Sequence, residues 1–151
     1  MARLVADADV LAADLLVGDE ARAAMDLVRA HDWIELVASD ELLDDAEAVI
    51  AELADRTLAG DWRERVESLA VTVSHPAGDH PGMAAAVHGD AAHLLSLDPE
   101  LVSPAGNVTV SRAADLSIRR PEAFVSVFDP PSMYEVVVGG RYPGPDRDPR
   151  D

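Results

Sequence analysis

The sequence predicts a three-layer α/β/α fold, in which helices cover both faces of a mainly parallel sheet of five strands. One observation is that short apolar runs alternate along the chain with longer segments of helical periodicity. Such alternation is typical of parallel sheets built with right-handed crossovers. The other is size, because 151 residues, 48% of them hydrophobic, are enough for one domain with a substantial core.

Three strands are expected in the first half of the chain, at residues 2–6, 33–38 and 69–73. Helical spacing of apolar residues predicts an amphipathic helix that starts at Asp19. It also predicts a long helix over residues 40–56, with Ser39 as its N-cap. A further helix is expected to start at Gly60 and to carry Trp62 on its apolar side.

The second half of the chain predicts a helix over residues 83–88 capped by Asp79, strands over 92–97 and 107–110, and a helix from Pro121. Residues 139–151 consist mainly of Gly, Pro, Arg and Asp. We therefore expect a domain over residues 1–130 and a C-terminal extension over 131–151 that is mostly flexible. Within that extension, residues 133–138 are apolar enough to add an edge strand or to pack on the sheet.

The charge of the chain is strongly acidic. There are 29 acidic against 12 basic residues, a formal net charge of −17, and all the basic residues are arginine. The surface either binds a basic partner or is adapted to a salt-rich cytoplasm, where charges are screened within about 3 Å at 1 M salt. The even spread of acidic residues favours adaptation to salt, and the lysine-free composition resembles that of haloarchaeal proteins. The net charge of −17 argues against nucleic-acid binding driven by bulk electrostatics.

Several classes of site are not expected from the composition. The chain has no cysteine, which excludes disulfides, thiolate catalysis and zinc–thiolate sites. His75, His80, His88 and His93 do not have the i, i+4 spacing of a helical zinc-ligand pair. No apolar run approaches the roughly 18 residues of a membrane helix, and no signal peptide is visible. We expect a cytoplasmic protein without membrane contact.

Four carboxylates lie where predicted strands end or where predicted helices begin. Asp7 and Asp98 close apolar runs, Asp79 precedes a helix, and Asp45 lies one turn inside another. Open α/β sheets bind ligands outside the carboxyl ends of their strands. Carboxylates gathered there repel one another unless a cation neutralises them, and oxygen ligands suit Mg²⁺ or Mn²⁺. The pattern predicts metal-dependent phosphodiester chemistry, although Asp79 and Asp98 also suit simple helix N-caps.

Several stretches occur in an order that has a parallel in a known family. They are residues 5–11, 39–45, 79–98 with its alanine-rich helix, 108–110 and 121–124. Their order and spacing, over residues 3–128, resemble those of PIN-domain ribonucleases. The resemblance implies a PIN-like fold and the hydrolysis of RNA phosphodiester bonds by a metal-activated water.

The resemblance also implies roles for single residues. Asp7 and Asp98 would be direct ligands of Mg²⁺ or Mn²⁺. Asp79 and Asp45 would hold a second ion or its waters, with Asp45 in the place where the family usually has glutamate. Ser96 would orient a carboxylate or contact a phosphate by hydrogen bonding.

Two residues beside the ligands are further candidates, since Asp9 follows Asp7 closely and His80 could serve as a base or contact the substrate. Ala92 stands where many members of the family carry another aspartate. The implied partners are an RNA substrate, an antitoxin protein if the enzyme is a toxin, and a second copy of the chain. A toxin and an RNA-processing enzyme are not distinguished.

Two alternatives belong to other classes of function. Asp45 in place of glutamate and Ala92 in place of an acid also suit a catalytically inactive PIN-like interaction module. A receiver domain of the response-regulator type has a similar fold with clustered aspartates. It needs a lysine, which this chain lacks, and a phosphorylatable aspartate where the third strand ends in Val73-Ser74-His75.

Overall fold

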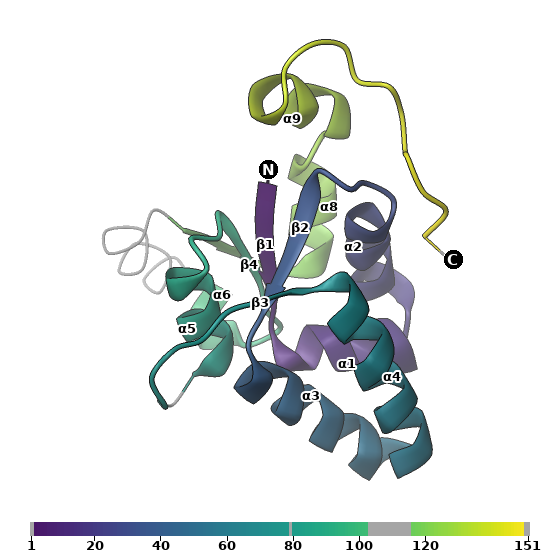
Figure 1. Ribbon diagram of the computed structural model, residues 1–151, viewed down its shortest axis with the longest axis vertical. Helices are drawn as coiled ribbons and strands as arrows, with labels where there is room; N and C mark the ends of the chain where they lie inside the picture. The colour runs from purple at the N-terminus through teal and green to yellow at the C-terminus, as the bar shows by residue number, and fades with distance from the viewer. Residues whose placement is uncertain (1, 79, 103–115, 150–151) are drawn as a thin grey trace.

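The fold is of the predicted α/β class, and all strands of its sheet are parallel. A computed structural model describes residues 2–78, 80–102 and 116–149. The five strands lie in the order β3-β2-β1-β4-β5, and every pair of neighbours is parallel (Figure 1). Their bounds are β1 (Ala2–Ala6), β2 (Ile34–Ala38), β3 (Val71–Thr72), β4 (His93–Leu95) and β5 (Ser117–Arg119).

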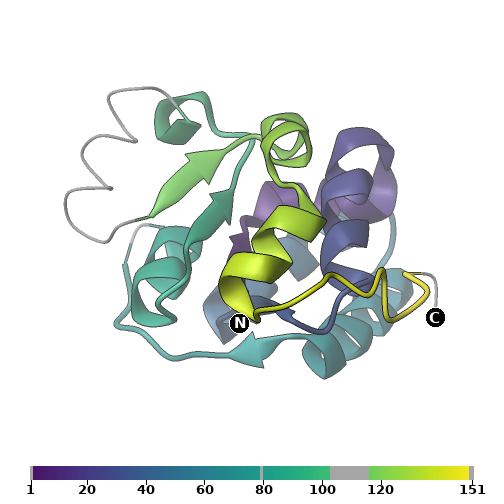
Figure 2. The same cartoon turned by 90° about the horizontal axis from the view of Figure 1, so that it is seen from above.

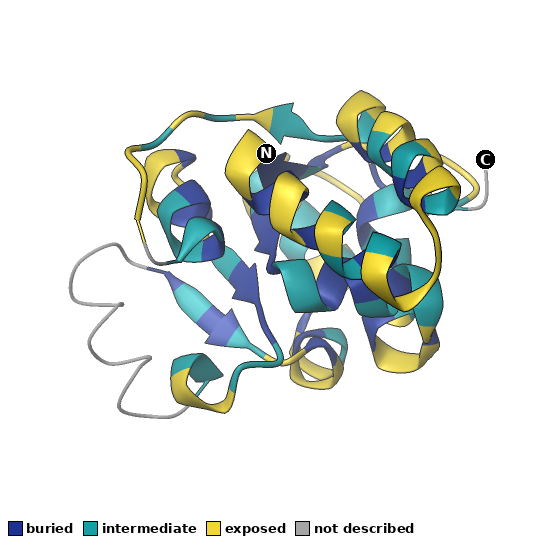
Figure 3. Cartoon of the chain, turned by 90° about the horizontal axis from the view of Figure 1, so that it is seen from below, coloured by how far each residue is buried: buried dark blue, intermediate teal, exposed yellow. Residues whose placement is uncertain are grey.

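Helices cover both faces of the sheet. The described helices are α1 (Ala8–Leu16), α2 (Asp19–Arg29), α3 (Asp40–Leu53), α4 (Arg56–Leu69), α5 (Pro81–His88), α6 (Pro99–Val102), α8 (Pro121–Val127) and α9 (Pro130–Val137). One face is covered by α5, which packs across β1, β2 and β4, and the other by α2 and α8 (Figures 1 and 2). The central strands are buried, and the helices that pack on the sheet bury one side and expose the other (Figure 3), as expected of a parallel sheet.

The strand order creates a switch point between β1 and β4. The chain passes from β1 outward to β2 and β3, and then returns to β4 and β5 on the other side of β1. Ala6 pairs with Leu95, and the N–H of Asp7 donates to the carbonyl of Leu95 at 2.8 Å. The carboxyl ends of β1 and β4 therefore lie side by side, which is where such sheets bind ligands.

Several elements differ from their prediction in the structure. The helix α1 was not predicted, because its apolar residues surround most of the helix and show little periodicity. The fourth helix starts at Arg56 instead of Gly60, since the Asp55 carboxylate caps it by accepting from the Leu58 N–H at 2.7 Å. The strand expected over residues 107–110 lies outside the described residues, and β5 lies further along the chain.

The start of α5 is also corrected. The helix begins at Pro81, and the side chain of His80 caps it. Asp79, the predicted cap and a predicted ligand, lies outside the described residues.

The C-terminal extension is held against the domain at specific points. Residues 133–137 belong to α9 and pair with no described strand, which excludes the edge strand as one of the two predicted alternatives. Packing, the other alternative, is closer to the structure, because Met133, Tyr134 and Val137 pack against the hydrophobic core. Residues 139–149 form no helix or strand, yet Tyr142 hydrogen-bonds to His31 at 2.6 Å. Both carboxylate oxygens of Asp146 accept from the Asp32 N–H, at 3.0 and 3.1 Å. The sequence pattern predicts an extension that is mostly flexible, and it gives no signal for these particular contacts.

Candidate acidic site at the carboxyl ends of β1 and β4

Asp7 is the centre of the acidic site. It directly follows β1, is buried, and caps α1 by accepting from the Ala8 N–H at 3.0 Å through Oδ1. Its other oxygen, Oδ2, accepts from the hydroxyl of Ser96 at 3.0 Å. The carboxylate is thus fixed by donors from two neighbouring strand ends.

Ser96 connects Asp7 to Asp98. The serine is fully buried just after β4, and its Oγ also accepts from the Asp98 N–H at 3.0 Å. This geometry suits the orienting role that the resemblance implied. The Asp98 carboxylate caps α6, where Oδ1 accepts from the Glu100 N–H at 2.9 Å. Asp98 therefore caps a helix, which is one of the two roles that the sequence suggested for it.

Asp9 has an oxygen without a partner. Its Oδ2 accepts from the Leu97 N–H at 3.2 Å, while Oδ1 is buried and has no hydrogen-bond partner among the described residues. Burial, the negative charge of Asp7 and, more weakly, that of Asp98 raise the pKa of Asp9 against the opposing effect of the backbone N–H groups of Leu97 and Val10. The three carboxylates therefore interact electrostatically, and Asp9 carries an acceptor that a cation or a donor could satisfy.

His80 and Gly82 complete the surroundings of Asp7. The Nδ1 of His80 accepts from the Met83 N–H at 3.2 Å, so a neutral ring carries its proton on Nε2, which lies 3.6 Å from Asp7 Oδ2. A Cβ atom at Gly82 would lie only 2.7 Å from Asp7 Oδ1. Glycine therefore allows the N-terminus of α5 to approach the carboxylate, whose negative charge the helix dipole favours.

Asp45 is not drawn into this group. It lies on the exposed side of α3 and makes no hydrogen bond or ion pair within the described residues. The site thus contains Asp7, Asp9, Ser96, Asp98 and His80. Asp79, the other predicted ligand, lies outside the described residues.

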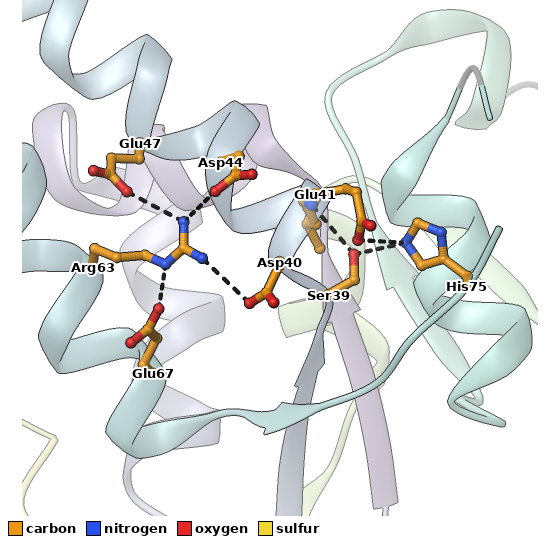
Figure 4. A network of polar contacts seen from close by, with 9 residues as sticks. Ser39, Asp40, Glu41, Asp44, Glu47, Arg63, Glu67 and His75 are labelled. Carbon is orange, nitrogen blue, oxygen red and sulfur yellow. Dashed lines mark hydrogen bonds and ion pairs between the residues drawn. The ribbon is translucent and has the colours of Figure 1, made fainter. Parts of the chain in front are cut away.

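A second polar contact lies at the start of α3, at the carboxyl end of β2. The Oγ of Ser39 accepts from the Leu42 N–H at 3.2 Å and lies 2.7 Å from Nε2 of His75 (Figure 4). Because Nδ1 of His75 lies 2.9 Å from the carbonyl of Pro76, a neutral ring is protonated there and accepts the Ser39 hydroxyl proton at Nε2. The carboxylate of Glu41 lies 3.6 Å from the same nitrogen.

This contact was missed in the sequence because its partners are 36 residues apart. Only the Ser39 cap has a local signal. The side chain of His75 is 1% exposed, so the contact holds the segment before α5 against α3. The contact therefore joins the carboxyl end of β2 to the segment that precedes α5.

The chain matches the model of a described family over residues 1–150, the "Family of unknown function (DUF7384)". The protein belongs to this family. No match to the chain was found among curated proteins or among solved structures. The description of the family names no activity.

In this DUF7384 chain, the described residues of the acidic site offer few side-chain ligands for a metal ion. Within residues 2–78, 80–102 and 116–149, no three side chains of His, Asp or Glu converge in a group that could hold a metal ion. Mg²⁺, however, is commonly held by only one or two carboxylates, with waters completing its shell. The unpartnered Oδ1 of Asp9 beside the Asp7 carboxylate fits that kind of site.

Within the same part of the chain, no helix combines the length and the apolar composition of a membrane span.

Proposed function

We propose that the protein is a metal-dependent endoribonuclease of PIN-like type, which hydrolyses RNA phosphodiester bonds at the acidic site. One observation carries the proposal: hydrogen bonds with Ser96 and Leu97 hold Asp7, Asp9 and Asp98 together at the switch point between β1 and β4, where a parallel sheet binds ligands. The all-parallel sheet of five strands supports the PIN-like resemblance at the level of the fold.

The residues of the site have distinct tasks in this proposal. Asp7 and Asp9 would hold Mg²⁺ or Mn²⁺, with Asp98 next to them and Asp79 as a further ligand implied by the resemblance. When bound, the ion would make a water lose its proton more readily and so become a nucleophile able to attack phosphorus, and it would neutralise charge on the phosphodiester. Ser96 and the Leu97 N–H keep Asp7 and Asp9 from rotating. The Nε2 proton of His80 is placed to donate to a phosphate oxygen.

The negative charge of the chain limits how it could recognise RNA. A chain of net charge −17 does not gather RNA by its overall field. Recognition would therefore depend on local contacts with the phosphate at the site, and on a medium that screens repulsion. The proposal includes a toxin neutralised by an antitoxin protein as well as an RNA-processing enzyme.

The test combines Mn²⁺ binding by calorimetry in molar KCl with RNA cleavage in the same buffer. Wild type is compared with the double variant Asp7→Asn/Asp98→Asn, in which asparagine preserves both helix caps. We expect binding and cleavage by wild type and the loss of both in the double variant. Equal, negligible binding by the two proteins would overturn the proposal.

Single variants assign the ligands. Asp9→Asn removes the charge of the unpartnered carboxylate and is expected to weaken Mn²⁺ binding, whereas Asp45→Asn on the exposed side of α3 is expected to change it little. Strong loss of Mn²⁺ binding in Asp45→Asn would show that α3 moves to bring its carboxylate to the ion.

A specific observation favours a second function, a PIN-like interaction module without catalysis. The oxygens of Asp7 already accept from Ala8 and Ser96, and Asp98 caps α6. Local donors thus satisfy much of the negative charge without a cation. The same calorimetry distinguishes the two, because the inactive module binds no Mn²⁺.

A further inference from the structure

A large pocket lies apart from the acidic site. It has a volume of about 950 Å³ and is bounded by α1 and α2 on one side and by α4 on the other. Its floor is apolar and reaches the core through Leu11, Met25, Leu36, Trp62 and Val66. None of the acidic-site residues lines it. Its size is that of pockets which hold organic ligands.

The C-terminal extension forms one wall of this pocket. Residues 146–149 line it, and the N–H groups of Asp146 and Arg147 donate to the carbonyl of Ala30 at 2.9 and 3.3 Å. Ala30 is the C-cap of α2, so the extension satisfies a free carbonyl at that helix end. After α9, the extension runs along the side of the domain where α2 lies and reaches the C-terminus there (Figure 1). The pocket is therefore assembled from segments that are distant in sequence.

The acceptors at the α1–α2 side of the pocket are already used. Both oxygens of Asp14 accept from Arg29 at 2.8 Å in a bidentate pair, and Asp26 accepts from the same guanidinium at 2.8 Å. Burial opposes the positive charge of Arg29, but these carboxylates outweigh it and raise the pKa of Arg29. The three residues form a closed ionic group with little capacity for a cationic ligand.

Within the part of the chain that the structure describes, two guanidinium groups at the pocket have no carboxylate partner. Arg22 donates to the carbonyls of Asp14 and Leu15, at 3.0 and 3.1 Å, and to no acid within the described residues. Arg65 lines the pocket from α4, and its guanidinium makes no hydrogen bond or ion pair there. Asp61, one helical turn earlier, lines the pocket without pairing with Arg65. In a chain with 29 acids and 12 arginines, guanidinium groups that pair with no carboxylate of the described residues and lie beside an apolar floor point to an anionic ligand.

We propose that this pocket binds an amphipathic organic anion, with its apolar or aromatic body on the floor at Trp62 and its acidic group at Arg22 and Arg65. The arrangement is that of a ligand site, because a broad apolar surface is combined with a few polar groups that fix orientation. The inference is independent of the metal and of the proposed nuclease reaction.

The test titrates the full chain with 8-anilinonaphthalene-1-sulfonate by calorimetry, and with N-phenyl-1-naphthylamine as its uncharged analogue. Arg65→Gln removes the proposed anchor. Arg56→Gln is the matched control, since Arg56 is exposed on the same helix, has the same charge and does not line the pocket. We expect one sulfonate per chain, binding weakened by about fivefold to tenfold in Arg65→Gln, and less than about a twofold change in Arg56→Gln.

Location is tested in the Trp33→Phe variant, in which Trp62 is the one remaining tryptophan of the chain. Energy transfer from Trp62 to the bound sulfonate is expected. Three outcomes would overturn the proposal: no binding, equal weakening by the two arginine variants, or equal affinity for the uncharged analogue. Binding without transfer from Trp62 would place the sulfonate elsewhere and would also overturn it.

Discussion

Gly82 brings the N-terminus of α5 against Asp7 at a distance that no side chain permits. The absence of a Cβ atom at this one position lets the helix dipole and the Nε2 of His80 face the Asp7 carboxylate. The geometry of the proposed metal site thus depends on a residue that contributes no functional group.

Gly82→Ala tests this dependence. The new methyl group would lie 2.7 Å from Asp7 Oδ1, so the helix or the carboxylate must shift. We expect the free energy of unfolding to fall by about 1–3 kcal/mol and Mn²⁺ affinity to fall by at least about tenfold, measured by urea denaturation and calorimetry. Gly60→Ala is the control, since no atom lies within 4 Å of its methyl group inside α4. It should gain about 0.5–1 kcal/mol. A Gly82→Ala protein unchanged in both quantities would contradict the close approach.

His93 has a different kind of residue-scale importance, because it titrates inside an aromatic cluster. Its ring lies 5.4 Å from Phe124 and 6.0 Å from Phe128, centroid to centroid, and its buried Nδ1 has no hydrogen-bond partner among the described residues. Burial lowers the pKa of His93, and the charge of Arg119 acts in the same direction. The native state therefore takes up a proton at His93 less readily than the unfolded chain does.

The expected consequence is a loss of stability in mild acid. At high pH both states are neutral at His93, and below pH 6.5, the ordinary value, the unfolded chain is protonated first. The free energy of unfolding should then fall until the pH passes the lowered folded pKa. Urea denaturation between pH 8 and 5 should show a decline that is smaller in His93→Phe. His88→Gln, at an exposed position on α5, should keep the decline, and an unchanged slope in His93→Phe would contradict the assignment.

At the scale of elements, Arg63 holds α3 and α4 together. Its guanidinium contacts four carboxylates, on Asp40, Asp44, Glu47 and Glu67, of which three belong to α3 (Figure 4). Burial works against the charge of Arg63, but hydrogen bonds with Asp44 and Glu67 raise its pKa. Without this cation the helices would present facing negative charges.

Arg63→Gln should therefore destabilise the protein in a salt-dependent way. Exposed ion pairs contribute little individually, so we expect a loss of about 1 kcal/mol at 0.1 M KCl, mostly from repulsion among the remaining acids. Screening should reduce this loss in 2 M KCl. Arg65→Gln, on the same helix but without an ion pair in the described residues, should cost little at either salt concentration. Equal losses by both variants would show that only general charge matters.

At the scale of the whole molecule, the C-terminal extension joins parts that the sheet does not connect. Tyr142 contacts His31, and Asp146 and Arg147 bind the end of α2. The extension thereby stabilises the turn before β2 and closes one side of the pocket.

Asp146→Ala should release this segment without unfolding the domain. The Asp32 N–H loses its acceptor, so we expect faster hydrogen exchange at that amide and at residue 147, with a stability loss of about 1 kcal/mol. Glu135→Ala, an exposed change of equal charge on α9, should leave exchange at these amides unaltered. Unchanged protection in Asp146→Ala would show that the backbone contacts alone hold the extension.

The sequence by itself determined the class of the fold and most of its elements. Periodicity and capping are local properties, and they sufficed for β1, for β2 and for α3 with its Ser39 cap. They also placed Asp7 and Asp98 at strand ends, because the apolar runs end just before these residues or close to them. Where the local signal was weak, as in α1, the element was missed.

Only the tertiary structure decided which side chains meet. The contacts of Asp7 with Ser96 and His80, the link from Ser39 to His75 and the docking of Asp146 join residues far apart along the chain. The unpartnered oxygen of Asp9 and the space that Gly82 leaves are likewise products of packing. Such features depend on the order of the strands and on how closely α5 approaches them. Local periodicity indicates only which face of an element is buried, so it predicts neither the strand order nor this distance.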